Sequence, residues 1–110
     1  MKTKILGSVL LFLTLVTQSY ASITVRGNHY SGTDSDGDFY EYEFSTSGTL
    51  KYTSPSGTYS NGTWQQYKSS IFIETNGHYK VCIGIVDETS LEFKCWNKNN
   101  QFWMHTLEKK

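Results

Sequence analysis

Hydrophobic and polar residues alternate along short runs in most of the chain after residue 21. In one such run Tyr40, Tyr42 and Phe44 lie between Glu41 and Glu43. A period of two residues is that of a strand with one buried face. No long window repeats its apolar positions at the spacing of a helix. The pattern predicts an all-β protein whose aromatic face is the core.

Turn residues separate the runs and set the number of strands. Gly, Asn, Asp and Ser favour turns because they tolerate positive φ or bond their own backbone, and Asn76-Gly77 is a strong hairpin signal. After residue 21 the chain has no alanine and one proline, Pro55, a composition that suits strands better than helices. We expect eight strands, near residues 23–30, 39–45, 49–53, 63–67, 70–74, 79–86, 91–97 and 102–107.

Eight short strands joined by tight connections predict an antiparallel meander. A sheet of this kind removes its exposed edges by closing into a β-barrel. A β-sandwich of two packed sheets is the alternative arrangement.

The first 21 residues have the pattern of a secretory signal peptide. Lys2 and Lys4 precede an apolar run over 5–16, and the segment ends at Ser19-Tyr20-Ala21, a small-x-small cleavage pattern. The apolar run is too short to span a bilayer. We therefore expect a signal peptide over 1–21, a single β-barrel domain over 22–110, a periplasmic or secreted location, and no membrane insertion after cleavage.

Charge gives no reason to expect nucleic acid as a partner. Loss of Lys2 and Lys4 takes the formal charge from zero to −2, and nucleic-acid binding needs a basic surface. Acidic residues gather between Asp34 and Glu43. They are either a solvated edge and turn or an acidic patch that meets a basic partner.

Several short motifs resemble a known family. The run Gly62-Thr63-Trp64-Gln65, the central Gly84, and Asn97 followed by Trp103 are similar to the closing half of small secreted lipocalin-like barrels. The resemblance covers residues 46–107. Lipocalins have a Gly-x-Trp motif near the start of the first strand, whereas residues 26–30 of this chain contain no tryptophan. The resemblance implies an eight-stranded meander and, in the wider family, a small apolar or aromatic ligand.

The two cysteines can form a cross-strand disulfide. Pairing Val86 with Leu91 in the last-but-one hairpin sets Cys82 opposite Cys95, at a separation that a disulfide can bridge. A register slipped by one residue would place Ile83 and Ile85 on the core face and would separate the cysteines. An oxidising compartment and a small domain favour the disulfide.

Metal, cofactor and catalytic motifs find little support in the sequence. The run Asp34-Ser35-Asp36-Gly37-Asp38 resembles the opening of a calcium loop, but the Gly and Glu of an EF-hand are missing. A looser calcium site of Asp34, Asp36 and Asp38 and a plain hairpin turn both stay open. Histidines lack metal-binding spacing, and no nucleophile elbow, phosphate loop or dinucleotide fingerprint occurs. We expect no enzyme activity and no cofactor.

Aromatic residues are the candidates for recognition. Inward-facing aromatic residues either line a cup for a ligand or fill the barrel, because side chains can completely occupy so small an interior. Outward-facing aromatic residues suit a protein interface. The sequence thus predicts a binding protein: either an inhibitor or immunity-type factor that binds an extracytoplasmic protein, or a carrier of a small apolar or aromatic ligand. The candidate residues are Tyr40, Tyr42, Trp64, Trp96 and Trp103.

Overall fold

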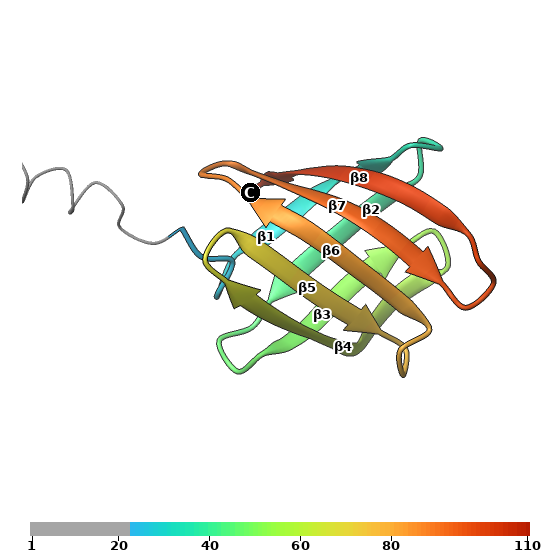
Figure 1. Ribbon diagram of the computed structural model, residues 1–110, viewed down its shortest axis with the longest axis horizontal. Coiled ribbons are helices and arrows are strands. Elements are labelled where there is room, and N and C mark those ends of the chain that lie inside the picture. Colours follow the sequence, from blue (N-terminus) through green and yellow to red (C-terminus); the bar gives the residue numbers. More distant parts are fainter. Residues whose placement is uncertain (1–22) are drawn as a thin grey trace, which may run out of the picture.

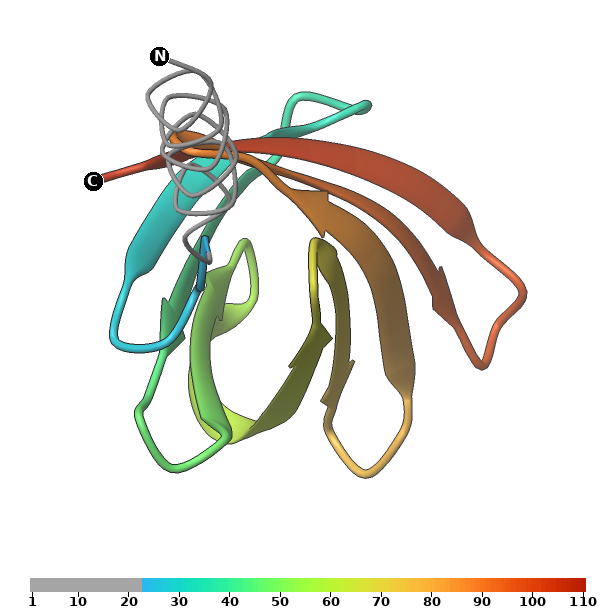
Figure 2. The ribbon, with the colours of Figure 1, turned by 60° about the vertical axis from the view of Figure 1, so that its left-hand side comes forward.

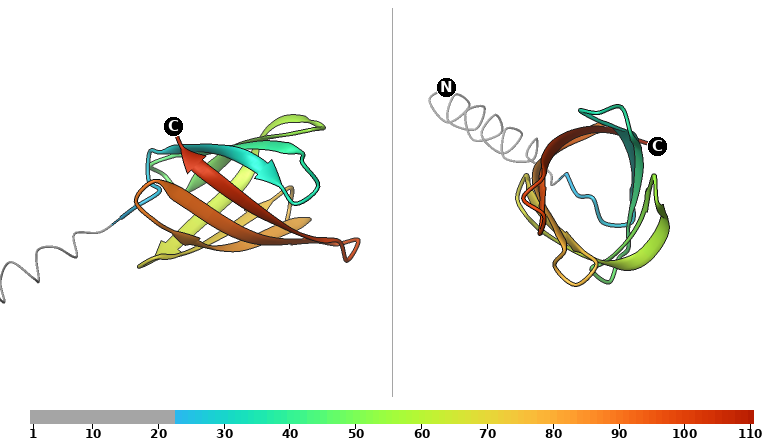
Figure 3. Two further views of the ribbon diagram at one scale, coloured as in Figure 1. Left: turned by 90° about the horizontal axis from the view of Figure 1, so that it is seen from above. Right: turned by 90° about the vertical axis from the view of Figure 1, so that its right-hand side faces the viewer.

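Eight strands follow one another along the chain, and each pairs antiparallel with the next. The computed structural model describes residues 23–110, so the expected signal peptide lies outside the described residues. β1 also pairs with β8, which closes the sheet into a barrel (Figure 1; Figure 3, right). The prediction of an all-β meander barrel is confirmed, and the sandwich alternative is wrong. The strands are β1 (His29–Asp34), β2 (Phe39–Phe44), β3 (Thr49–Ser54), β4 (Gly57–Tyr67), β5 (Ser70–Thr75), β6 (Lys80–Val86), β7 (Ser90–Asn97) and β8 (Phe102–Lys109).

The first strand starts later than the sequence predicts. Residues 23–28 do not continue β1; they cross one end of the ring of strands instead (Figure 3, right). Gly27 has φ of 74° and its N–H donates to Phe44 O at 2.7 Å. This bend turns Val25 into the barrel, where it is completely buried. The segment therefore closes this end (Figure 2).

β4 is longer than expected, because its first half has no alternating apolar pattern. The sequence predicts a strand from residue 63, but pairing with β3 begins at Gly57, opposite Ser54. Apart from Tyr59 the added residues are polar or glycine, and the register shifts between Leu50 and Tyr52. Backbone pairing across the tight turn, rather than side-chain burial, thus forms this half of the strand.

The interior is packed with aromatic and aliphatic side chains. Tyr30 meets Phe44 edge to face at 5.7 Å, and Tyr42 meets Phe93 in the same way at 5.7 Å. The β6–β7 register is the predicted one, with Gly84 opposite Phe93, and the Cys82–Cys95 disulfide is present. The fully buried core includes Tyr30, Tyr42, Phe44, Leu50, Ile71, Ile73, Leu91, Phe93 and Leu107.

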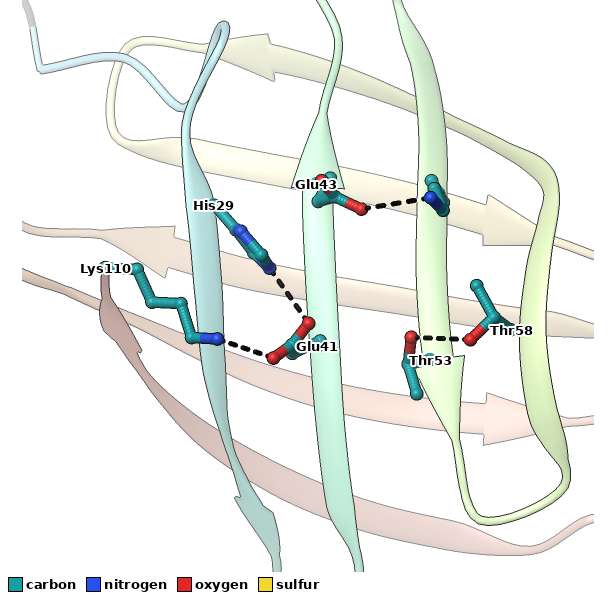
Figure 4. Close-up of polar contacts among 7 residues, drawn as sticks. His29, Glu41, Glu43, Thr53, Thr58 and Lys110 are labelled. Carbon is teal, nitrogen blue, oxygen red and sulfur yellow. Dashed lines mark hydrogen bonds and ion pairs between the residues drawn. The ribbon is translucent and has the colours of Figure 1, made fainter.

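The outer face of β1–β3 is covered by paired polar side chains (Figure 4). Glu41 accepts from His29 Nε2 at 3.1 Å and from Lys110 Nζ at 2.6 Å. Lys51 lies 3.8 Å from Glu43. These two carboxylates are already neutralised within the chain and do not form an unpaired acidic patch. Across residues 23–110 no helix has the length and apolarity needed to cross a bilayer.

Candidate functional site

The two ends of the barrel differ, and the one opposite residues 23–28 is open. Four hairpin turns surround it, at the right-hand side of Figure 1: β1–β2, β3–β4, β5–β6 and β7–β8. A cavity of about 300 Å³ opens between them. We call it the mouth pocket. Its principal walls are Tyr40, Tyr52, Tyr59, Tyr79, Trp103 and Lys80.

Lys80 points into the barrel from the first position of β6. Side chains alternate along a strand, so Lys80 shares the inner face with Cys82 and Gly84, and only 7% of its surface is exposed. Its ammonium donates a 2.6 Å hydrogen bond to the phenol oxygen of Tyr42 on β2. The disulfide thus fixes the face on which this lysine lies.

Aromatic rings surround the ammonium of Lys80 on several sides. Its Nζ lies 5.0 Å from the ring centre of Tyr40, 4.9 Å from that of Tyr42 and 5.3 Å from that of Tyr52. The ring centre of Trp103 is 5.9 Å away. Cations at such distances are attracted by the electron-rich ring faces. The rings therefore replace part of the hydration that burial removes.

The charge on Lys80 has no direct counter-charge. No carboxylate of the described residues lies within ion-pairing distance of its Nζ. Burial lowers the pKa of Lys80 to about 7, and the Asp34 carboxylate opposes this fall through its longer-range field. Both the ammonium and the neutral amine are consequently populated near neutral pH.

A short hydrogen-bond chain continues from Lys80 to β8. Trp103 Nε1 donates to His105 Nε2 at 2.7 Å, and Tyr42 Oη lies 3.4 Å from the same nitrogen. Nε2 is therefore the acceptor, and the network assigns the ring proton to Nδ1. Burial and the nearby Lys80 charge lower the pKa of His105 to about 3, against an opposing effect of Asp34. His105 is thus neutral and holds Trp103 against the pocket.

A ring nitrogen of His105 also lies within 4.8 Å of the sulfurs of Cys82 and Cys95, the only group of three potential metal ligands among residues 23–110. The sulfurs are bonded to each other, so they are not thiolate ligands. The buried Nδ1 has no hydrogen-bond partner within the described chain. This group is packing beneath the mouth pocket.

Asp34 organises the turn at the rim. Its Oδ1 accepts the backbone N–H groups of Asp36 and Asp38, each at 2.9 Å. Burial first, and Asp34 second, raise the pKa of Tyr40 to about 12. The three aspartates do not converge as a metal-ligand group in the described part of the chain. The structure therefore gives Asp34 a part in the turn, and the looser calcium site stays a prediction.

The five aromatic candidates from the sequence lie in three different places. Tyr40 and Trp103 line the mouth pocket, as expected for a cup. Tyr42 and Trp64 are buried, and Trp64 Nε1 donates to Ser45 O at 3.1 Å near the closed end. Trp96 lies on the outer surface. Aromatic side chains thus pack in the barrel core at Tyr42 and line a pocket at its open end.

A second exposed feature covers the outer side of β6–β8. The cysteine register turns Ile83 and Ile85 outward, and they are 52% and 63% exposed. Trp96 packs on Phe102 at 5.4 Å. We call this surface the outer apolar face; its residues are Ile83, Ile85, Trp96, Phe102 and Met104.

A larger hollow of about 640 Å³ lies at the closed end, beside Ile23 and Trp64. Polar groups such as Arg26 and Gln66 border it, and both already bond backbone carbonyls. The mouth pocket combines the buried ammonium of Lys80 with aromatic walls.

Sequence reasoning missed Lys80, although a signal was present. If Cys82 and Cys95 face inward, alternation places Lys80 on the same inner face two residues earlier. Comparison with protein-family models, with curated proteins and with solved structures gives no match. The lipocalin-like resemblance therefore stays a prediction.

Proposed function

We propose that the protein is an exported, non-enzymatic carrier that binds a small planar organic anion in the mouth pocket. The observation that carries the proposal is the unpaired ammonium of Lys80 at the wall of an aromatic cavity. The Cys82–Cys95 disulfide supports a periplasmic or secreted location, since disulfides persist in oxidising compartments.

The lysine is costly for stability and useful for binding. A buried charge without a counter-charge destabilises a folded protein, and an apolar side chain of similar size would pack there at lower cost. A carboxylate entering the mouth pocket would supply the missing partner of Lys80. Its hydrogen bonds would be strengthened by the low local dielectric.

The walls of the pocket suit a flat ligand. Tyr52 and Tyr59 lie 5.5 Å apart on one side, and Tyr40 and Trp103 lie near the lysine on the other. Aromatic rings of this kind stack on planar groups. The volume of about 300 Å³ is at the lower end of the range for small-molecule sites. A ligand of one or two rings with one acidic group fits these features.

The test uses a matched pair of probes, 2-naphthoate and its neutral amide. Calorimetry on the mature protein should show naphthoate binding more tightly than the amide by about tenfold or more, the value of a charge-assisted hydrogen bond. The Lys80→Met variant should lose that preference. Lys94→Met, at an exposed lysine on β7, should keep it. Absence of naphthoate binding, or equal preference in Lys80→Met, would contradict the proposal.

The outer apolar face favours a second candidate function. Exposed apolar side chains lie on β6–β8, with Lys94 and Glu92 between them, and they include the Trp96–Phe102 pair. An exposed tryptophan of this kind is typical of a protein interface. In this alternative the protein is an inhibitor or immunity-type factor that binds an extracytoplasmic protein, such as a secreted hydrolase or toxin, through Trp96 and Phe102.

Affinity capture with paired variants tests this alternative. Tagged mature protein should retain one extracytoplasmic protein at near-stoichiometric amount. The Trp96→Ser/Phe102→Ser variant should lose it, whereas Phe39→Ser should not, because Phe39 is similarly exposed but lies on β2. Equal capture by all three proteins would show that the outer apolar face is not the interface.

A further inference from the structure

The two protonation states of Lys80 can do different chemistry. The ammonium can act as a counter-charge for an anion, and the neutral amine can act as a nucleophile. Its nitrogen lies at the wall of the mouth pocket, among the rings of Tyr40, Tyr52 and Trp103. Lysines that form Schiff bases sit in desolvated pockets of this kind. The same site therefore has the geometry for a covalent step.

We propose that the mouth pocket captures small planar aldehydes reversibly, as a Schiff base on Lys80 Nζ. This inference rests on the proposed ligand-binding function and adds a second ligand class to the same pocket. The lone pair of the neutral amine attacks the carbonyl carbon and forms the C–N bond. The carbonyl oxygen then departs as water with the two hydrogens of the amine, which leaves a C=N bond. No oxidant or reductant is consumed.

Tyr42 is placed to assist this exchange. Its phenol oxygen lies 2.6 Å from Lys80 Nζ, and burial raises the pKa of Tyr42 well above its usual value. The phenol therefore keeps its proton at neutral pH and can donate it to the departing oxygen, recovering a proton from the nitrogen. The Oη–Nε2 contact to His105 at 3.4 Å holds the phenol near this position.

The exposed lysines of the same chain serve as internal controls. Lys51 lies on the outer face of β3 beside Glu43, and Lys94 lies on the outer face of β7. Neither faces the mouth pocket. A lysine of ordinary pKa has less than about a thousandth of its amine neutral near pH 7. Burial lowers the pKa of Lys80 to about 7, so a much larger fraction of its amine is neutral there.

The decisive experiment is reductive trapping of 2-naphthaldehyde on the folded mature protein at pH 7. Cyanoborohydride transfers hydride to the iminium carbon and fixes the adduct as a secondary amine, which peptide mass mapping locates. We expect Lys80 to carry about tenfold or more label than Lys51 or Lys94, and 2-naphthoate to protect it. Labelling without preference for Lys80 would overturn the inference.

Naphthoate binding and the pH dependence of trapping separate covalent capture from the anion binding on which it rests. If naphthoate binds but Lys80 is not labelled, covalent capture is wrong and anion binding stands. If naphthoate does not bind and Lys80 is not labelled, covalent capture and anion binding are both wrong. The initial rate of trapping at Lys80 should rise between pH 6 and 8 while naphthoate affinity falls, and parallel pH profiles would contradict covalent capture. The titratable groups that face Lys80 from the surrounding strands are Asp34, Tyr40, Tyr42, Tyr52 and His105.

Discussion

Lys80 and Tyr42 join two non-neighbouring strands across the inside of the barrel through a 2.6 Å hydrogen bond. β6 pairs with β5 and β7, whereas β2 pairs with β1 and β3. The bond therefore does not belong to the sheet ladder. It places a charge in the interior that a purely structural barrel would not need, and this conflict between stability and charge can be measured.

The Lys80→Met variant should be more stable than wild type at pH 6. The pKa of Lys80 is lowered to about 7 in the folded state from an ordinary 10.5. Between these values the unfolded chain binds the proton and the folded chain does not. Wild-type stability should therefore rise from pH 7 towards pH 10, by at most about 1.4 kcal/mol per pH unit.

Urea unfolding followed by tryptophan fluorescence at pH 6, 8 and 9.5 measures this dependence. The variant should lack the rise, so its advantage over wild type should shrink as pH increases. Lys94→Met provides the control at an exposed lysine. A wild-type profile that stays flat over this range would show that the folded pKa of Lys80 is not lowered.

The Asp34→Asn variant should lower the pKa of Lys80 further below about 7. The Asp34 carboxylate is the one group that opposes the effect of burial on this lysine. Asparagine retains an oxygen that can accept the N–H groups of Asp36 and Asp38, so the turn can persist. The ¹³Cε shift of Lys80 in lysine-labelled protein reports the titration. An unchanged or raised midpoint would exclude this role of Asp34.

Much of the fold could be predicted from local patterns. The alternation of Tyr40, Tyr42 and Phe44 with Glu41 and Glu43 gave β2 and its inner face, since period two is a property of the strand itself. The bend at Gly27 and the polar first half of β4 could not be predicted. The bend depends on a hydrogen bond to Phe44, which is distant in sequence. The first half of β4 has no apolar alternation of its own and forms by backbone pairing with β3.

The site was harder to predict than the fold because β6 reverses the usual preference for apolar side chains inside and charged side chains outside. Apolar Ile83 and Ile85 face outward on β6, and charged Lys80 faces inward. Hydrophobicity alone favours the opposite register, whereas the covalent bond between Cys82 and Cys95 holds the observed one. Places where a sequence breaks its own local rules are often functional.

Loss of the disulfide should destabilise the barrel by about 3 kcal/mol, the value expected for a loop of this length on the chain-entropy model. The bridged residues are 13 apart in sequence. Reductant should lower the urea midpoint of wild type, whereas a Cys82→Ala/Cys95→Ala variant should not respond to reductant. Intact mass should show no free thiol before reduction. Two free thiols in the exported protein, or a midpoint insensitive to reductant, would contradict this prediction.

Gly84→Ala should destabilise the barrel strongly, by roughly 1–3 kcal/mol or more, as overpacking of a core does. A methyl group at Gly84 would collide with the backbone oxygen of Glu92 and lie 2.6 Å from Phe93 Cδ1. A backbone oxygen cannot move without disturbing the β6–β7 pairing, so adding Phe93→Leu should restore little of the loss. Ile83→Ala, at the adjacent exposed position, should change the urea midpoint far less. A wild-type midpoint in Gly84→Ala would mean that β6 and β7 can separate locally at no cost.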